Sequence, residues 1–169
     1  MTHEESGSPG FGPHFRWSLV LAFLLVPAPV FALLISMSLE SIAGSVPLGG
    51  DGTTTATLNF GRVSAFEPLS AGVNRTVGAS NYTVSTRFGV RATHALFLLS
   101  PNYTLRARLQ SGHPLTWRVN GTTMSTSAVT IATSQPYGAI VPHTLSFVVP
   151  FNHTAGAVTT VFEVTAIAN

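Results

Sequence analysis

The asparagines of this chain are the residues whose type and spacing point most directly to a chemical modification. Five of its seven asparagines stand two positions before a threonine. The Asn-x-Thr triplet is the acceptor for N-linked glycosylation, which attaches a bulky sugar to the surface of a protein outside the cytoplasm. The five predicted acceptors are Asn74, Asn81, Asn102, Asn120 and Asn152. All five follow one long apolar segment, so the chain after about residue 44 is predicted to be extracytoplasmic and to carry N-linked glycans.

Few other side chains could perform catalysis or bind a metal. After residue 44 the only acidic residues are Asp51, Glu67 and Glu163. An active site needs several groups in complementary roles, so no enzymatic activity, catalytic residue or cofactor is predicted. His143 and His153 could meet Glu163 across the last hairpin and bind a metal. The favoured interpretation is instead solvated loop histidines beside an outward glutamate, and no metal site is predicted.

The charged residues are sparse and are not clustered. They make up 8% of the chain, against roughly 25% in an ordinary soluble domain, and every basic residue is an arginine. No run of basic residues exists, which argues against nucleic-acid binding. Arg106 and Arg108 share one predicted strand face, with Arg87 and Arg118 as candidate neighbours. The favoured interpretation is a solvated sheet face, and the alternative is a contact patch for an acidic sugar or a neighbouring subunit.

The chain contains no cysteine. A disulfide scaffold, a thiolate metal site and a cysteine nucleophile are therefore excluded. The extracytoplasmic part must be stabilised by its own apolar core, and about 125 residues are enough to form one.

The amino-terminal region predicts a membrane-associated segment. Residues 1–16 are polar and are predicted to be a disordered cytoplasmic tail. Trp17–Leu39 then gives 23 positions without a charge, and a helix needs about 20 apolar residues to span a bilayer. Arg16 precedes this segment and Glu40 follows it, so the positive-inside tendency places the amino terminus in the cytoplasm. One N-terminal hydrophobic helix is predicted over 17–39, followed by a Gly/Pro-containing linker over 40–53.

Two interpretations of residues 17–39 remain open, a retained transmembrane anchor and a cleaved signal segment. The length favours an anchor, because a signal has an apolar stretch of about 7–15 residues. Pro27 and Pro29 favour a signal, because proline breaks the interior of a helix. Three triplets of small residues could serve as cleavage sites, and they end at Ala32, Ser38 and Ala43.

The remainder of the chain, residues 54–169, predicts an all-β fold. Apolar and polar residues alternate with a period of two, as expected of strands with one buried face. The alternating segments are residues 82–90, 103–110, 115–119, 145–151 and 162–166, and the continuous apolar run 95–99 predicts a further, fully buried strand. Trp117 and the phenylalanines are expected in the core, and Tyr82 and Tyr103 at strand starts. Asn120-Gly121 predicts a tight type I′ hairpin turn. The fold class is therefore an antiparallel, immunoglobulin-like β-sandwich.

Two segments resemble secreted pilin-type β-sandwich subunits. The row Thr54–Val63 after a hydrophobic leader resembles the first strand of such a subunit, and residues 143–166 resemble its terminal hairpin. Archaeal surface pilins are similar in lacking cysteine, in being rich in threonine and in carrying several N-linked glycans. The resemblance implies a structural subunit of a filament.

A second resemblance is to the membrane-anchored late-embryogenesis-abundant, or water-stress, β-sandwich. Leu115–Met124 resembles the strand, Asn-Gly turn and strand of that family. The order of cytoplasmic tail, single anchor and glycosylated domain is also similar. This resemblance implies a membrane-anchored protective protein.

The function favoured by these observations is a structural glycoprotein of a cell surface or of a pilus-like filament. One hypothesis for assembly is strand exchange, in which residues 44–60 insert into the sheet of a neighbour. The alternative is a single-pass membrane-anchored binding or protective glycoprotein, including a viral envelope protein or an accessory subunit of a membrane complex. A glycan-binding module is a third candidate. The expected partners are the membrane, through residues 17–39, and neighbouring copies or other surface proteins.

Overall fold

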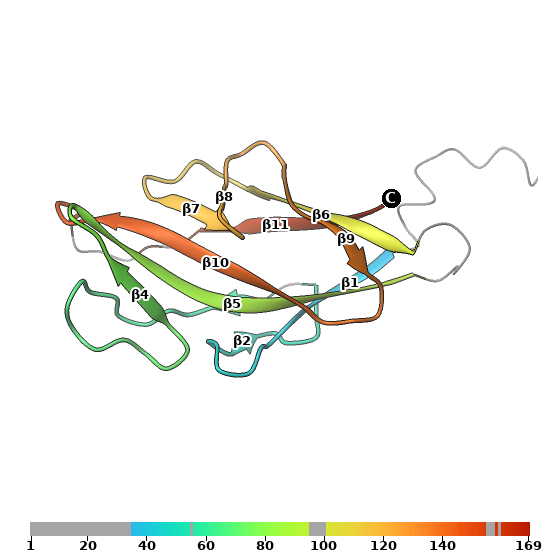
Figure 1. Cartoon of the computed structure of the whole chain (residues 1–169), viewed down its shortest axis with the longest axis horizontal. Coiled ribbons are helices and arrows are strands. Elements are labelled where there is room, and N and C mark those ends of the chain that lie inside the picture. Colours follow the sequence, from blue (N-terminus) through green and yellow to red (C-terminus); the bar gives the residue numbers. More distant parts are fainter. Residues whose placement is uncertain (1–34, 55, 95–100, 155–157, 159) are drawn as a thin grey trace, which may run out of the picture.

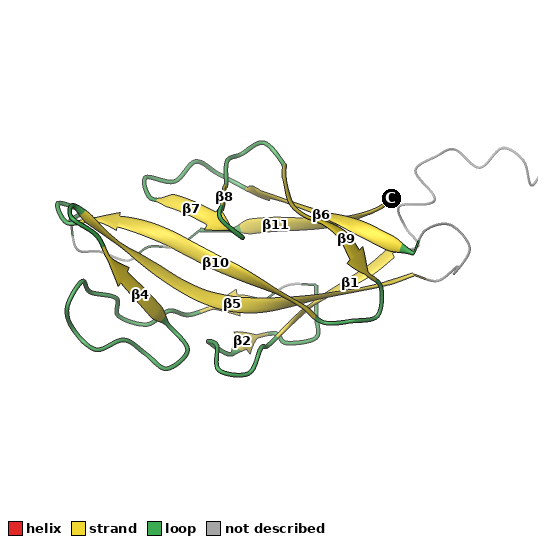
Figure 2. Ribbon diagram, in the orientation of Figure 1, coloured by secondary structure: helices red, strands yellow, loops and turns green. Residues whose placement is uncertain are grey.

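The computed structural model describes residues 35–54, 56–94, 101–154, 158 and 160–169. These residues form eleven strands and no helix (Figures 1 and 2). Every strand pairing is antiparallel, which confirms the predicted all-β antiparallel class. The predicted N-terminal helix lies outside the described residues as far as residue 34. Within the described ranges, no helix has the length and apolar character needed to cross a bilayer.

The larger of the two main sheets has six strands. Its strand order is β1-β5-β10-β7-β8. Strand β4 also pairs with β5, at residues 82–85, whereas β1 pairs with residues 89–94. The strands are β1 (Ile35–Glu40), β4 (Asn74–Val77), β5 (Asn81–His94), β7 (Thr116–Val119), β8 (Thr122–Thr123) and β10 (Val141–Pro150). The two longest, β5 and β10, run side by side along the length of the molecule (Figure 1).

The second main sheet has three strands and covers part of the first. Its order is β11-β6-β9, with β6 (Asn102–Leu109) between β9 (Val129–Pro136) and β11 (Phe162–Ala168). A separate short hairpin pairs β2 (Leu48–Gly49) with β3 (Thr57–Leu58). Because β11 and β9 are edge strands, the backbone of each is paired on one side only in the described sheet.

Alternation along the strands builds one core between the sheets. On β6, Tyr103, Leu105 and Ala107 are fully buried, whereas Arg108 is exposed. On β5, Val84, Val90 and Ala92 are buried in the same way, and the two sets belong to one cluster. The architecture is therefore sandwich-like, as the periodicity predicted. Trp117 is a buried core residue and Tyr82 and Tyr103 lie at the starts of β5 and β6, as predicted. Of the phenylalanines predicted in the core, Phe88 and Phe147 are buried, but Phe66 and Phe151 are exposed.

Most of the predicted strands are present. The alternating segments lie in β5, β6, β7, β10 and β11. The Asn120-Gly121 turn joins β7 to β8 with φ of 50° and 81°, the positive values that a type I′ turn requires. The predicted strand 95–99 lies outside the described residues. Strands β1, β2, β4 and β9 were not predicted.

Strand β1 changes the predicted boundaries. Ile35–Glu40 pairs with Gly89–His94 of β5 over six register positions. The end of the segment predicted as an anchor is therefore a strand, and the described β-structure includes residues before the predicted boundary at 54. The physical reason is visible in the sequence, because Ile35, Met37 and Leu39 alternate with serines and pack against the core.

The predicted linker 40–53 also packs on the sandwich. Val46 is 5% exposed, and its N–H donates to Oγ1 of Thr86 on β5 at 3.1 Å. The Thr86 hydroxyl donates in turn to the carbonyl of Gly72 at 2.8 Å. This buried threonine therefore fastens two crossing segments to the part of β5 that lies between the β1 and β4 pairings.

Candidate functional site

The five predicted glycosylation acceptors all lie at strand starts or in turns. Asn74, Asn81 and Asn102 are the first residues of β4, β5 and β6. Asn152 lies in the turn that follows β10, and Asn74 and Asn152 are both exposed. All five thus have the placement expected of an acceptor, at strand ends or in turns rather than in an inward row, and Asn120 is exposed as well.

The side-chain amide of Asn120 is fully engaged in hydrogen bonds. Its Nδ2 donates to the carbonyl of Ile131 on β9 at 3.0 Å and lies 2.9 Å from Nδ1 of His143 on β10. Its Oδ1 accepts from the N–H of Thr144 at 2.9 Å. This one side chain therefore joins the β7–β8 turn to both main sheets.

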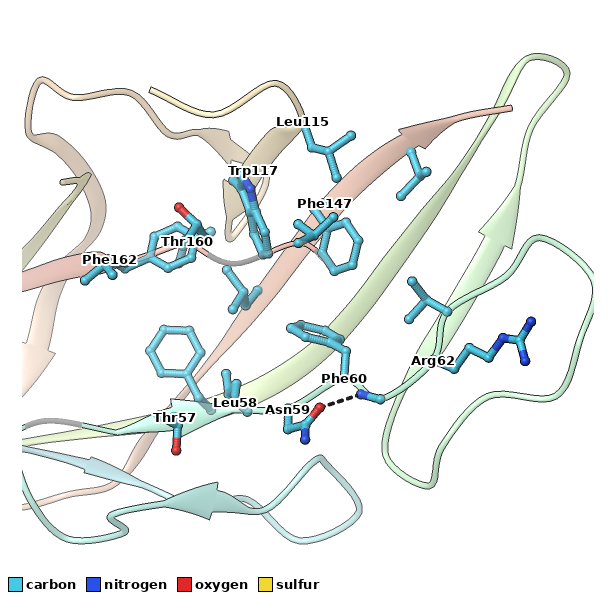
Figure 3. A pocket seen from close by; sticks show the side chains of 18 of the residues that line it. Thr57, Leu58, Asn59, Phe60, Arg62, Leu115, Trp117, Phe147, Thr160 and Phe162 are labelled. Atoms are coloured by element: carbon cyan, nitrogen blue, oxygen red, sulfur yellow. Dashed lines mark hydrogen bonds between the residues drawn. The ribbon is translucent and has the colours of Figure 1, made fainter. Parts of the chain in front are cut away.

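The described residues form an apolar cavity. It has a volume of about 1520 Å³ and lies between the inner face of the six-stranded sheet, the segment around β3 and the start of β11. Figure 3 shows Trp117, Phe147, Phe162 and Phe60 converging on it from four segments. Ligand cavities typically have volumes of about 300–1,000 Å³, so this space exceeds the requirement of an ordinary small molecule.

The rings around the cavity pack edge to face. The Phe60 ring centroid lies 5.1 Å from that of Phe147 at an interplanar angle of 88°. The Phe162 centroid lies 5.3 Å from that of Trp117 at 76°. These contacts hold the segment after β3 and the start of β11 against the large sheet. Arg62 and Asn59 lie on the segment after β3, and Oδ1 of Asn59 accepts from the N–H of Gly61 (Figure 3).

The mouth of this cavity gathers exposed apolar side chains. Seven large hydrophobic residues are exposed among the described residues, and four of them line the cavity. These four, called the mouth residues below, are Phe66, Phe151, Val158 and Val161. Phe66 is 80% exposed, and its ring stacks on that of Phe151 at a centroid distance of 6.2 Å.

The predicted arginine face is divided between the two sheets. Arg106 and Arg108 lie on β6 of the three-stranded sheet, whereas Arg87 and Arg118 lie on β5 and β7 of the other. Arg106 donates to the carbonyl of Ala128 at 2.8 Å, and Arg108 forms an ion pair with Glu163 at 2.6 Å. The four side chains do not form one anion-binding patch.

The considered metal ligands are held by other contacts. His143 is 2% exposed, so its interpretation as a solvated loop histidine is wrong. Burial lowers the pKa of His143 and favours the neutral ring. Glu163 on β11 is paired with Arg108 on β6, and His153 lies in the turn after β10. Among the described residues, no three His, Cys, Asp or Glu side chains lie close enough together to hold a metal ion.

No protein-family model matches this chain, and no curated protein matches it in sequence.

Sequence reasoning missed both the cavity and the Asn120 contacts. The burial of His143 had a usable signal, because it shares strand parity with Leu145, Phe147 and Val149. The mouth residues come from two loops, after β3 and after β10, that only the folded chain brings together. Phe151 was predicted in the inward row 145–151, and this was wrong, because it lies in the turn after β10 and is exposed.

Proposed function

We propose that this chain is an extracytoplasmic, N-glycosylated, immunoglobulin-like β-sandwich that serves as a structural subunit of a cell surface or filament. The observation that carries the proposal is the apolar cavity with four exposed hydrophobic residues at its mouth. Exposed apolar side chains that gather at one place on a surface mark an interaction site. The occupant that suits a structural subunit is an apolar segment of a second copy.

The edge strand β11 supports this mode of assembly. Its residues Phe162 and Val164 line the cavity, and β11 pairs with β6 on one side only in the described sheet. An extended segment that pairs with the open edge would add main-chain hydrogen bonds and place alternate apolar side chains in the cavity. Glu163, the charged residue of this strand, is already paired with Arg108. It therefore presents less of the free charge that commonly protects sheet edges.

Strand exchange through residues 44–60 is less well supported than assembly at the cavity mouth. Val46 is buried in its own domain, and Phe60 packs on Phe147 of the same chain. Release of this segment to a neighbour would expose both side chains. We therefore place the contact at the mouth residues, which are exposed before any partner binds.

Charged substitutions at the mouth test the proposal. The double variant Phe66→Asp with Val161→Asp changes two mouth residues that are 80% and 50% exposed, so the fold should persist. The matched control, Val77→Asp with Ile140→Asp, changes residues that are 46% and 40% exposed and that neither line the cavity nor lie on β11. Sedimentation velocity and electron microscopy should show assemblies for the native chain and the control, and monomers for the mouth variant. Equal assembly of both variants, or a monomeric native chain, would refute the proposal.

The same cavity favours a second candidate, a membrane-anchored binding or protective glycoprotein. A concave space lined by aromatic rings also suits an apolar ligand. Trp117 lines the cavity, so its fluorescence should respond to titration with an apolar dye. Saturable binding by a monomer that retains residues 17–34 would support this candidate over the structural subunit.

Strand β1 restricts how a leader could be removed. Cleavage after Ser38 would cut within β1, and cleavage after Ala43 would remove the whole strand from β5. Cleavage after Ala32 would leave Ile35–Glu40 intact. Of the three candidate sites, only the one ending at Ala32 is therefore compatible with the β1–β5 pairing.

A further inference from the structure

The Asn120 triplet satisfies the acceptor pattern as well as the other four do, and its side-chain amide is held by three contacts. The turn that carries it lies at the edge of the six-stranded sheet, where β8 ends the strand order. There the amide reaches both β10 and β9. Its contacts decide whether a sugar can be attached to it in the folded domain.

The orientation of the amide is fixed by its partners. The N–H of Thr144 needs an acceptor, and Oδ1 of Asn120 is that acceptor at 2.9 Å. The backbone of the same turn adds a bond, because the N–H of Asn120 donates to the carbonyl of Thr144 at 2.9 Å. Nδ2 therefore points toward the carbonyl of Ile131 and the ring of His143, which are themselves on buried residues.

Both hydrogens of Nδ2 are used in these contacts. An amide NH₂ group has two donors, and the carbonyl oxygen of Ile131 and Nδ1 of His143 are two acceptors. N-linked glycosylation replaces one of the Nδ2 hydrogens with a sugar. Asn120 as a residue is exposed, so the obstacle lies at its amide nitrogen: a glycan there would break at least one contact with Ile131 or His143, which are 6% and 2% exposed.

We infer that Asn120 is a structural residue that joins the two sheets and is not glycosylated in the folded protein, so that the N-linked glycans are confined to the other acceptors. This inference rests on the proposed glycoprotein function for the other sites. In this role the Asn120 amide holds the β7–β8 turn against Ile131 of β9 and His143 of β10. The surface of the β7–β8 turn would then carry no sugar.

Two variants separate the structural role from the glycan acceptor role. Asn120→Gly and Thr122→Val both destroy the Asn-x-Thr triplet, but only Asn120→Gly removes the amide. Glycine accepts the positive φ of this position, so the turn itself is preserved. Loss of these hydrogen bonds should lower the Tm of Asn120→Gly by about 4–10 °C, with Thr122→Val close to the native value.

Glycan mass provides the second readout, with the chain produced in a host that performs N-glycosylation. Thr122→Val should leave the glycan mass unchanged, whereas the control Thr154→Val should lose the glycan of Asn152. A glycan on Asn120 of the folded native chain, or equal Tm values for Asn120→Gly and Thr122→Val, would overturn the inference. If no triplet carries a glycan, the glycoprotein proposal fails, and the Tm comparison still decides the structural role of Asn120.

Discussion

Nδ2 of Asn120 and Nδ1 of His143 lie 2.9 Å apart, and this contact sets the protonation state that the fold can accept at His143. Because Nδ2 can only donate, Nδ1 of His143 must be the acceptor, which places the ring proton on Nε2. His143 is also in contact with the Phe88 ring, at a centroid distance of 5.7 Å. Neither neighbour carries a charge that would stabilise a protonated imidazole.

The first prediction is a loss of stability in acid. Burial lowers the pKa of His143 in the folded state below its ordinary value of 6.5, so the unfolded chain binds a proton more readily. The stability that neutral His143 contributes is fully present above pH 6.5 and should be lost as the pH falls below it.

Thermal unfolding measured across this pH range should show the loss of stability in the native chain and in His153→Gln, which changes an exposed turn histidine. His143→Gln should flatten the profile below pH 6.5. An unchanged profile in His143→Gln would contradict the assignment.

A second prediction concerns Gly72, where the segment before β4 crosses the backbone of Ser45 and Val46. This glycine has a φ of +80°, and a Cβ added to it would overlap the backbone of Ser45 and Val46. Gly72→Ala should therefore destabilise the domain by more than about 1 kcal/mol, because the backbone strain and the overlap add. Gly112→Ala is the matched control, because a Cβ there would meet no atom within 4 Å. Urea unfolding compares the midpoints of the two variants. Equal midpoints would contradict the close contact between Gly72 and the Ser45–Val46 backbone.

A third prediction concerns the wall of the cavity. Trp117 is 5% exposed and contacts Phe147 at 4.6 Å and Phe162 at 5.3 Å between ring centroids. Trp117→Ala should cost about 3–5 kcal/mol of unfolding free energy, the range for large aromatic residues in a core. Trp117→Phe should cost much less, because it keeps an aromatic ring against both partners. Calorimetry of the two variants distinguishes a core residue from a surface aromatic, for which both changes would be nearly neutral.

The sequence was most informative where one face of a strand is buried. The alternation of Leu105 with Arg106, or of Trp117 with Arg118, predicted strands that the structure contains. The Asn120-Gly121 turn was likewise predictable, because few residue pairs accept positive φ at both positions.

The errors arose where local pattern and tertiary context differ. Ile35–Glu40 continues a long apolar run, so its alternation was read as part of a membrane segment. Strand β9 is largely polar because it is an edge strand, and only Ile131 is buried on it. The division of the arginines between sheets depends on strand order, which alternation does not encode. The apolar cavity depends on loops after β3 and β10 that meet only in the folded chain.

The fourth prediction concerns maturation and glycosylation together, and peptide mapping of the native protein by mass spectrometry tests it. The mature chain should retain Ile35–Glu40, either because it starts at Leu33 or because residues 17–34 are kept. Enzymatic removal of N-glycans converts each glycosylated asparagine to aspartate. This change should mark sites among Asn74, Asn81, Asn102 and Asn152 and should be absent at Asn120. A mature chain that starts at Leu39 or Gly44 would contradict the β1–β5 pairing. Unmodified asparagine at all five positions would contradict the central claim that this is an extracytoplasmic glycoprotein.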